Sequence, residues 1–422
     1  MDLSSAASDA DASSSKPSSI LARTLDNARS SPAPTRWLLL LLMAMTAQGP
    51  ISLNIFIPAV PELVNAFATD PGTVQLTISL FLLSLASGQL VMGPLSDRFG
   101  RRPVVLGGLA LAGVASFAAM TARSIEALVI ARIVQAIGAS TGVVIGRTIV
   151  RDLYERDRAA AMLGLITTVM VIGPMIAPLL GGILNTTLGW QSIFIFLATF
   201  SSGTLIWAIV ALPETLKQST PAEHASRQPR EWRYLLSSPA FYCYTLIGAF
   251  GSAAFFTFLG GAPHVAIRIM GTSSAEYGAW IATASFGYML GNFAVSHSAG
   301  RYGMATLIRW GIFAQLSGAV LGAIVIFFAP ISPLAFFLPQ MVITFGSGLL
   351  LPNAITGAIS IHPKVAGTAA GIIGFVQMAM GAACTQIISH VLIHYPSALP
   401  VSIALLMTTS LTGMAYMALR RT

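Results

Sequence analysis

Charged residues are scarce in this chain. Only 9% of its 422 residues are Asp, Glu, Lys or Arg, whereas a soluble globular domain carries about 25%. Fifteen acids and 23 basic residues cannot cover the surface of several soluble domains, and 55% of the residues are hydrophobic. The composition excludes a water-soluble fold of this size and predicts a protein whose apolar surface faces a lipid bilayer.

Cysteine is nearly absent, and the residue patterns of enzymes are missing. Cys243 and Cys384 both lie inside apolar stretches, which excludes a disulfide framework and a cysteine-based metal site. The sequence holds no metal-ligand spacing, no phosphate-binding loop and no Ser/His/Asp arrangement. We therefore expect a protein that is not an enzyme and that uses no metal, cofactor or nucleotide.

A net charge of +8 can indicate nucleic-acid binding, but here it does not. The basic residues are scattered between apolar blocks, and none of them forms a patch interleaved with aromatic residues. We expect no nucleic-acid partner.

Long apolar blocks make up most of the chain. A membrane-spanning helix needs about 20 mostly apolar residues, and cutting the chain at charges, Pro and Gly clusters leaves twelve such blocks. The longest polar gap follows the sixth block, so six predicted spans precede it and six follow. The blocks cover residues 37–58, 73–95, 103–122, 126–147, 160–184, 190–212, 239–262, 276–297, 304–328, 332–353, 366–391 and 398–418.

These blocks divide the chain into four parts. Residues 1–36 are rich in Ser, Ala, Asp and Pro, and we expect a disordered cytoplasmic tail there, not a signal peptide. An N-terminal six-helix bundle is predicted at 37–212, a cytoplasmic connector at 213–238 and a C-terminal six-helix bundle at 239–422.

The basic residues predict the orientation in the membrane. If the N-terminus is cytoplasmic, every Lys and Arg except Arg123, Arg132 and Arg268 falls in a cytoplasmic segment. Cytoplasmic loops carry an excess of Lys and Arg. We therefore expect a multi-pass protein of the cell inner (cytoplasmic) membrane with both termini in the cytoplasm.

The two halves of the chain share a short sequence echo. Arg-Phe-Gly at 98–100 follows the second predicted span, and Arg-Tyr-Gly at 301–303 follows the eighth. Secondary transporters include folds with parallel repeats about an axis along the membrane normal. We therefore predict an all-α membrane protein of two six-helix bundles related by a pseudo-two-fold axis.

The most specific local pattern lies between the second and third predicted spans. It reads G-x-x-x-D-R-x-G-R-R from Gly93 to Arg102, and an ordinary positive-inside loop explains its arginines but not its spacing. The stretch resembles the loop 2–3 signature of the major facilitator superfamily, whose Asp and Arg residues form a cytoplasmic latch during alternating access. The resemblance implies the major facilitator fold and assigns the latch role to Gly93, Asp97, Arg98, Gly100 and Arg101.

A second pattern lies in the fourth span. Arg132 and Gln135 open a stretch that resembles the R-x-x-Q-G-x-G motif of the same superfamily, with Ala136 in place of the first Gly. An Arg near the membrane midplane costs about 2.5 kcal/mol or more, so it needs a cavity or a polar partner. Two interpretations stay open: a substrate-binding or coupling Arg, and a structural Arg bonded to backbone carbonyls.

A third pattern, in the fifth span, combines small residues with a proline. It resembles the motif that the superfamily associates with exporters that exchange substrate for protons, with Ala177 where the family has Gly. A generic packing helix is the alternative, because small-residue spacing is common in membranes. The residues of this antiporter motif are Gly164, Gly173, Pro178, Gly181 and Gly182.

A finer resemblance is to the bicyclomycin and chloramphenicol resistance (Bcr/CflA) branch of drug-efflux transporters. It rests on the stretches 53–61, 146–153 and 366–371 and on Pro263, and it extends over about residues 37–418. The branch adds Arg151 and Asp152 to the latch. It implies a monomeric secondary transporter that exports small drug-like or metabolite molecules by proton antiport.

One departure from this branch concerns the proton. These transporters usually hold an Asp, the expected proton carrier, at the position of Asn54, and an Asn cannot titrate. The remaining candidates are Glu62, near the predicted outer mouth, and His264 or His297 at span ends. Their alternative roles are a solvated loop acid and a His bonded to a backbone carbonyl. A facilitator or uptake transporter without proton coupling is therefore the second hypothesis.

The sequence also offers candidates for lining a substrate cavity. Aromatic residues of the seventh and eighth spans are candidates for its wall, although packing is their commoner role. The absence of midplane acids and the presence of an Arg favour neutral, zwitterionic or anionic compounds over lipophilic cations. The candidate substrate-binding residues are Asn54, Arg132, Gln135, Phe256 and Tyr288.

Overall fold

The computed structural model describes residues 36–154, 156–216, 235–328, 330–362 and 366–421. Over these ranges the chain is helical and contains no strand. The predicted tail up to residue 35 and residues 217–234 of the predicted connector lie outside the described residues.

Twelve long helices make up most of the described residues, in agreement with the all-α prediction. Ten membrane-span candidates are long and apolar enough to cross a bilayer, and α7 adds the shorter apolar stretch Ile172–Leu188. The long helices are α2 (Arg36–Asn54), α4 (Pro71–Phe99), α5 (Arg101–Met120), α6 (Ile125–Leu153), α7 (Arg156–Leu188), α8 (Gln191–Ala211), α11 (Pro239–Pro263), α12 (Ser274–Tyr302), α13 (Met304–Phe328), α14 (Pro333–Ser360), α15 (Ala366–His394) and α16 (Leu399–Leu419).

Three short helices continue the first and seventh spans. The 3₁₀-helix η1 (Ile57–Ala59) and helix α3 (Val60–Ala66) follow α2, and the π-helix η2 (His264–Ile269) follows α11. The first predicted block therefore breaks after Asn54, where Pro58 cannot donate to the preceding turn. Pro263 is the last residue of α11, and η2 continues this span candidate to Ile269.

The sequence echo corresponds to a structural repeat. Helices α4 and α12 are both 29 residues long, and each ends one residue before a glycine with positive φ. Gly100 has φ +98° and Gly303 has φ +74°, values that a side chain with a Cβ rarely adopts. Both glycines turn the chain directly into the next helix, so the two halves make the same turn at the same place.

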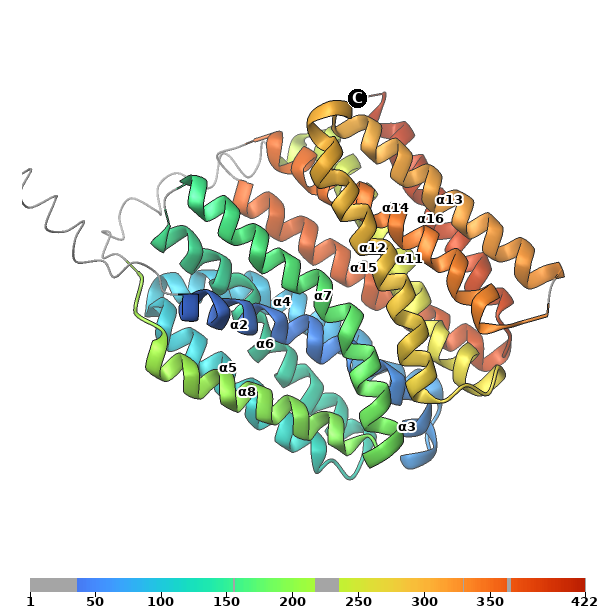
Figure 1. The fold of residues 1–422 in the computed structure, drawn as a ribbon, viewed down its shortest axis with the longest axis horizontal. Coiled ribbons are helices and arrows are strands. Elements are labelled where there is room, and N and C mark those ends of the chain that lie inside the picture. Colours follow the sequence, from blue (N-terminus) through green and yellow to red (C-terminus); the bar gives the residue numbers. More distant parts are fainter. Residues whose placement is uncertain (1–35, 155, 217–234, 329, 363–365, 422) are drawn as a thin grey trace, which may run out of the picture.

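The helices form two bundles, and four of them join the bundles. Helix α4 packs against α15, and α7 packs against α12. The pairs α5 with α8 and α13 with α16 lie on the outside of their bundles (Figure 1). Large apolar side chains project outward from these pairs, a surface that fits lipid and not water; they include Val114, Phe117, Ile206, Val210, Phe313 and Phe327.

The two ends of the molecule differ. We call the end that carries the α4–α5 loop the latch end, and the end that carries α3 and η2 the sealed end (Figure 1). At the sealed end the bundles are joined by hydrogen bonds, such as those from Ser274 to the Pro58 carbonyl (3.1 Å) and from Gln386 to the Gly72 carbonyl (2.9 Å). The structure therefore records a conformation closed at this end.

Candidate functional site

A cavity of about 250 Å³ lies between the two bundles. Helices α2, α4, α6 and α7 line it from one bundle, and α11, α12, α14 and α15 line it from the other. The described residues of its wall include no Asp, Glu, Lys, Arg or His. They are Pro50, Leu53, Asn54, Leu85, Gln89, Val143, Met170, Pro174, Ser252, Phe255, Phe256, Ser285, Tyr288, Thr344, Ser347, Leu351, Gln377 and Met378.

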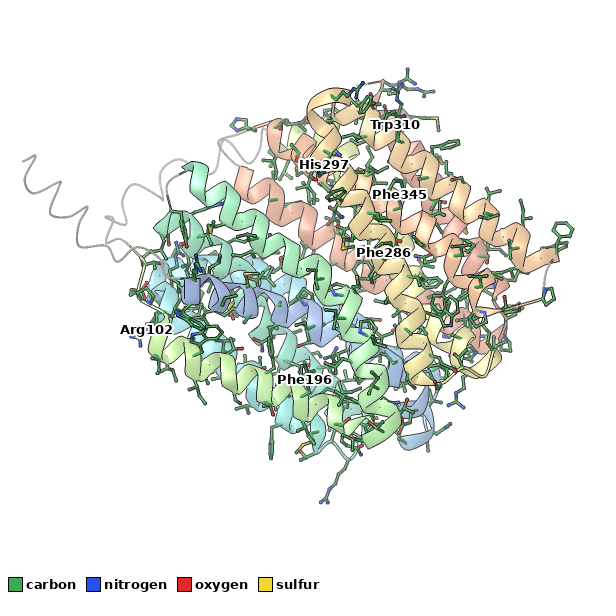
Figure 2. The ribbon with its side chains drawn as sticks, in the orientation of Figure 1. Arg102, Phe196, Phe286, His297, Trp310 and Phe345 are labelled. Carbon is green, nitrogen blue, oxygen red and sulfur yellow. The ribbon has the colours of Figure 1, made fainter. Side chains whose placement is uncertain are left out.

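Three of the predicted substrate-binding residues meet in this central cavity. Asn54 at the end of α2 is buried, and its Nδ2 donates to the Pro50 carbonyl at 2.8 Å. Phe256 of α11 packs edge-on against Phe255, with ring centroids 5.6 Å apart. Tyr288 of α12 completes the group. Phe286, another aromatic residue of the predicted eighth span, is exposed on α12 (Figure 2) and is not among the lining residues.

The other two predicted residues, Arg132 and Gln135, lie away from the cavity inside the N-terminal bundle. The Arg132 guanidinium is fully buried, and its Nη1 donates to the Ser52 carbonyl at 3.0 Å and to Gln135 Oε1 at 2.5 Å. It is also stacked between two aromatic rings, 4.0 Å from the Phe81 centroid and 4.7 Å from the Phe56 centroid. These contacts match the structural interpretation, because carbonyls and π-faces compensate the buried charge.

The antiporter motif packs α7 between α2 and α12. A Cβ atom on Gly181 would overlap the Ile55 carbonyl, and one on Gly182 would overlap the Ser274 carbonyl at the start of α12. Gly278 of α12 lies in the same way against the Pro178 carbonyl. Close backbone approach between the bundles therefore requires glycine on both helices. Gly164 also belongs to α7.

Pro178 has a second consequence at this interface. A proline inside a helix has no N–H, so the carbonyl four residues earlier loses its usual partner. Here that carbonyl belongs to Pro174, and it accepts a hydrogen bond from the Ser285 hydroxyl of α12 at 3.1 Å. The bond crosses between the bundles beside the central cavity. Ser285 was not predicted from the sequence.

The predicted latch is partly assembled at the latch end. The buried Arg101 guanidinium forms an ion pair with Asp97, and its Nε donates to Asp152 Oδ2 at 3.3 Å. Asp152 therefore links the end of α6 to the α4–α5 loop. Arg98 and Arg151 are exposed and stand outside this ion-pair network. At Gly93 of α4 there is room for a side chain next to α6, because a Cβ atom there would lie 3.8 Å from Val144, an ordinary van der Waals distance.

Glu214 belongs to the same network and was missed from the sequence. Its Oε1 accepts a hydrogen bond from the backbone N–H of Arg101 at 2.9 Å, and its Oε2 accepts one from Arg102 at 3.1 Å. Burial raises the pKa of this carboxyl, but hydrogen bonds from the backbone N–H groups of Leu216, Arg101, Arg102 and Thr215 outweigh it and hold the pKa below its ordinary value. The side chain of Arg102 reaches α8, where it donates to the Ile209 carbonyl (Figure 2).

Two of the three proton-coupling candidates, Glu62 and His264, lie at the sealed end, away from the central cavity. Glu62 of α3 accepts a hydrogen bond from Asn185 of α7 at 2.7 Å, and Asn185 also donates to Ser274 of α12 at 3.2 Å. Glu62 is exposed in the first turn of α3, and through Asn185 its contacts reach the other bundle. His264 begins η2 and lines a second cavity at this end. His297 is exposed near the end of α12, against the Phe293 carbonyl (Figure 2).

Comparison with known proteins identifies the family. The profile of the Major Facilitator Superfamily matches residues 39–385. This chain belongs to the major facilitator superfamily. Among curated relatives, the multidrug resistance protein D of Escherichia coli (strain K12) is 29% identical over 81% of this chain and 85% of its own length. The chloramphenicol resistance protein of Pseudomonas aeruginosa is 32% identical over 79% of each chain.

Further relatives and solved structures agree with this family. A bicyclomycin resistance protein homolog of Haemophilus influenzae is 27% identical over 82% of this chain and 86% of its own length. The inward-facing, unoccupied structure of a bacterial homolog of the human lysosomal transporter Spinster superposes with a TM-score of 0.73, at 16% identity, over 93% of this chain and 98% of that one. A peptide transporter solved with sulfate gives the same TM-score at 14% identity, over 94% and 98% of the two chains. The facilitator fold and the resemblance to the Bcr/CflA branch are thereby confirmed.

Proposed function

We propose that this facilitator is a secondary active transporter that exports small drug-like or metabolite molecules across the cytoplasmic membrane, by proton antiport. The observation that carries the proposal is the uncharged cavity between the bundles, closed at one end by contacts between them. The names of the relatives refer to multidrug, chloramphenicol and bicyclomycin resistance, and they support export of such compounds.

The predicted orientation assigns each end of the molecule to one side of the membrane. With both termini in the cytoplasm, the latch end is cytoplasmic and the sealed end faces outward. The structure is then closed on the outer side, and Arg101, Asp97 and Asp152 lie near the side from which substrate enters. Alternating access requires the contacts at the sealed end to break when the latch end closes.

The cavity favours uncharged substrates. Its polar groups are amides and hydroxyls, such as Asn54, Gln89, Gln377 and Ser252, among apolar and aromatic walls. A lipophilic cation that moves from water into this cavity finds no carboxylate to pair with, and an unpaired charge is costly in an apolar site. Arg132 lies behind the wall and does not offer its charge to the cavity. We therefore narrow the expected substrates to neutral or internally compensated molecules.

Proton coupling is assigned to the sealed end. Asn54 cannot titrate, so Glu62 and His264 are the proposed proton groups, both near contacts that must open during the cycle. Facilitated diffusion or uptake without protons is the second hypothesis, and Asn54 is the observation that favours it.

Purified protein in proteoliposomes distinguishes the two hypotheses. Radiolabelled chloramphenicol is loaded on one side, and its movement is followed with and without an imposed pH gradient. Antiport predicts movement against the concentration gradient only when the pH gradient is present, and loss of this effect in the double variant Glu62→Gln/His264→Asn. Equal rates of chloramphenicol movement with and without the pH gradient contradict antiport and support facilitated diffusion without protons. Failure to move the drug under either condition contradicts the choice of drug-like substrates.

A further inference from the structure

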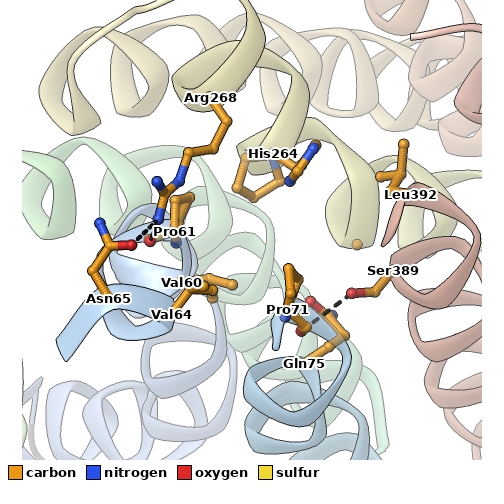
Figure 3. Close-up of a pocket in the computed structure, with 12 residues that line it drawn as sticks. Val60, Pro61, Val64, Asn65, Pro71, Gln75, His264, Arg268, Ser389 and Leu392 are labelled. Carbon is orange, nitrogen blue, oxygen red and sulfur yellow. Dashed lines mark hydrogen bonds between the residues drawn. The ribbon is translucent and has the colours of Figure 1, made fainter. Parts of the chain in front are cut away.

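The second cavity, at the sealed end, is separate from the central one. It has a volume of about 260 Å³ and lies between the bundles, with α3 and α4 on one side and α11, η2 and α15 on the other (Figure 3). None of its lining residues belongs to the wall of the central cavity. We propose that this outer cavity is a binding site for a small organic anion that carries a carboxylate or sulfonate group.

Arg268 supplies the positive charge. Its Nη2 donates to the Pro61 carbonyl at 2.6 Å and to Asn65 Oδ1 at 2.9 Å, so the guanidinium crosses from η2 to α3 (Figure 3). Both bonds use the same nitrogen, and the fork geometry of the guanidinium leaves Nε and Nη1 unused by them. Arg268 is an exposed residue of the cavity lining, and the planar fork of a guanidinium matches the geometry of a carboxylate or sulfonate group.

Gln75 supplies a buried donor without a partner. Its side chain is 2% exposed and lines the cavity, and its Nε2 has no hydrogen-bond partner. A buried donor in this condition destabilises the fold unless an acceptor reaches it. An anion is an acceptor only, so it satisfies Gln75 and pairs with Arg268 without bringing a donor of its own.

The lining contains no opposing negative charge. Glu62 and Asp70 are the acids nearest to the lining in sequence, and neither is among the lining residues. Their carboxylates accept hydrogen bonds elsewhere, from Asn185 and from Thr73. His264 also lines the wall and has a ring N–H, whereas the Ser389 hydroxyl donates to the Pro71 carbonyl at 3.3 Å (Figure 3). A cation has no carboxylate to bind here.

The remaining wall decides what kind of anion fits. Val60, Val64 and Leu392 are apolar, and three prolines add flat apolar surface. Such a wall accommodates an aromatic or alkyl body next to the charged group. Benzenesulfonate is a suitable probe, because it is charged at every accessible pH and does not dissipate a pH gradient. Benzenesulfonamide, with nearly the same shape and no charge, is its matched control.

An anion bound here contacts both bundles and therefore stabilises the conformation closed at the sealed end. A ligand shifts a conformational equilibrium toward the state that it binds more tightly. Under the proposed transport cycle, an anion added outside slows export. This consequence rests on the proposed function, whereas binding itself does not.

Binding is tested with purified protein in lipid nanodiscs by isothermal titration calorimetry. Benzenesulfonate should bind the unchanged protein at least ten times more tightly than benzenesulfonamide. Arg268→Gln should weaken binding at least ten-fold, whereas Arg123→Gln, the other arginine of this end, should not change it. Gln75→Leu should weaken binding several-fold without lowering thermal stability, because it removes an unpartnered donor.

Three results overturn the site. They are no binding at millimolar concentrations, equal binding of the charged and neutral probes, and equal affinities of Arg268→Gln and Arg123→Gln. Proteoliposomes then test the conformational consequence: external benzenesulfonate should slow chloramphenicol export by the unchanged protein but not by Arg268→Gln. Binding without any effect on export overturns the bridging role. Absence of export altogether contradicts the proposed function and leaves the binding result standing.

Discussion

The carboxylate of Glu214, just after α8, caps the helix that begins at Arg101. It accepts the backbone N–H of Arg101 at 2.9 Å and that of Arg102 at 3.1 Å, although the residues are more than one hundred positions apart. These N–H groups belong to the first turn of α5 and have no partner within the helix. The acid therefore joins the end of the N-terminal bundle to the loop that carries the latch.

Replacing Glu214 should lower the stability of the protein. Loss of an N-terminal cap costs about 0.5–2 kcal/mol, so Glu214→Ala should unfold at a lower temperature in thermal denaturation. Glu214→Gln keeps one acceptor oxygen, so its unfolding temperature should lie between those of the unchanged protein and Glu214→Ala. An unchanged unfolding temperature for Glu214→Ala would contradict the capping role.

The same residue predicts a pH dependence. Because the pKa of Glu214 is lowered in the folded protein, its contribution to stability is present above the ordinary pKa of glutamate and is lost as the pH falls through the lowered value. The difference in unfolding temperature between the unchanged protein and Glu214→Gln should be large at about pH 7 and shrink below about pH 4. A difference in unfolding temperature that grows on acidification would contradict a lowered pKa of Glu214 in the folded protein.

A second prediction concerns the glycines of α7, which are not equivalent. A Cβ on Gly182 would overlap the Ser274 carbonyl, whereas one on Gly173 would lie 3.6 Å from Ile51, an ordinary contact distance. Overpacking costs about 1–3 kcal/mol. Gly182→Ala should therefore disfavour the conformation closed at the sealed end, and Gly173→Ala should leave it unchanged.

Site-directed labelling measures this difference. A cysteine that replaces Ser389 in the outer cavity should react faster with a thiol reagent in Gly182→Ala than in the otherwise unchanged protein, because the sealed end opens more often. Gly173→Ala carries the same change of one methyl group and serves as the control. Equal reaction rates in both variants would show that the bundles relax without opening.

The sequence was sufficient to predict the long apolar helices, because a bilayer imposes a length and an apolar composition on each span, and ten span candidates occur among the described residues. It also identified Asp97 and Arg101, whose spacing is specific, and the resemblance to the Bcr/CflA branch added Asp152. It did not reveal Glu214, Ser285 or Asn185, because each acts through a partner on a distant segment. Their only local signal is a polar residue at the end of a span or on a helix face.

Arg132 shows a different limit of sequence reasoning. A charged residue in a span is a functional candidate by default, and the sequence left a binding role and a structural role open. The distinction depends on which carbonyls and rings surround the guanidinium, and these come from Ser52, Phe56, Thr77 and Phe81 of other helices. Hydropathy and spacing do not specify such a set of partners.

A third prediction addresses the latch. Asp97→Asn removes the ion pair with Arg101, at the end of the molecule and away from the central cavity. It should reduce the maximal transport rate several-fold with little change in substrate affinity, because it acts on the equilibrium between conformations. Glu276→Gln makes the same change of charge at the sealed end, where the carboxylate bonds within its own first turn, and should have a smaller effect. Loss of affinity at an unchanged maximal rate would place Asp97 in substrate binding.

The last prediction concerns Asn54, which lines the central cavity at the end of α2. Asn54→Asp introduces a carboxylate into a wall with no other charged group, where burial disfavours the ionised form and lets the group exchange a proton near neutral pH. The variant should depend more strongly on a pH gradient and should accept cationic substrates, with which the ionised group pairs. Asn54→Ala, which also loses the hydrogen bond to the Pro50 carbonyl but adds no charge, is the control. Transport with and without an imposed gradient checks both variants. Suppose that transport by the unchanged protein already stops when the pH gradient is collapsed, and that transport survives in the Glu62→Gln/His264→Asn variant. Then another group carries the proton, and the residue at position 54 does not decide the coupling.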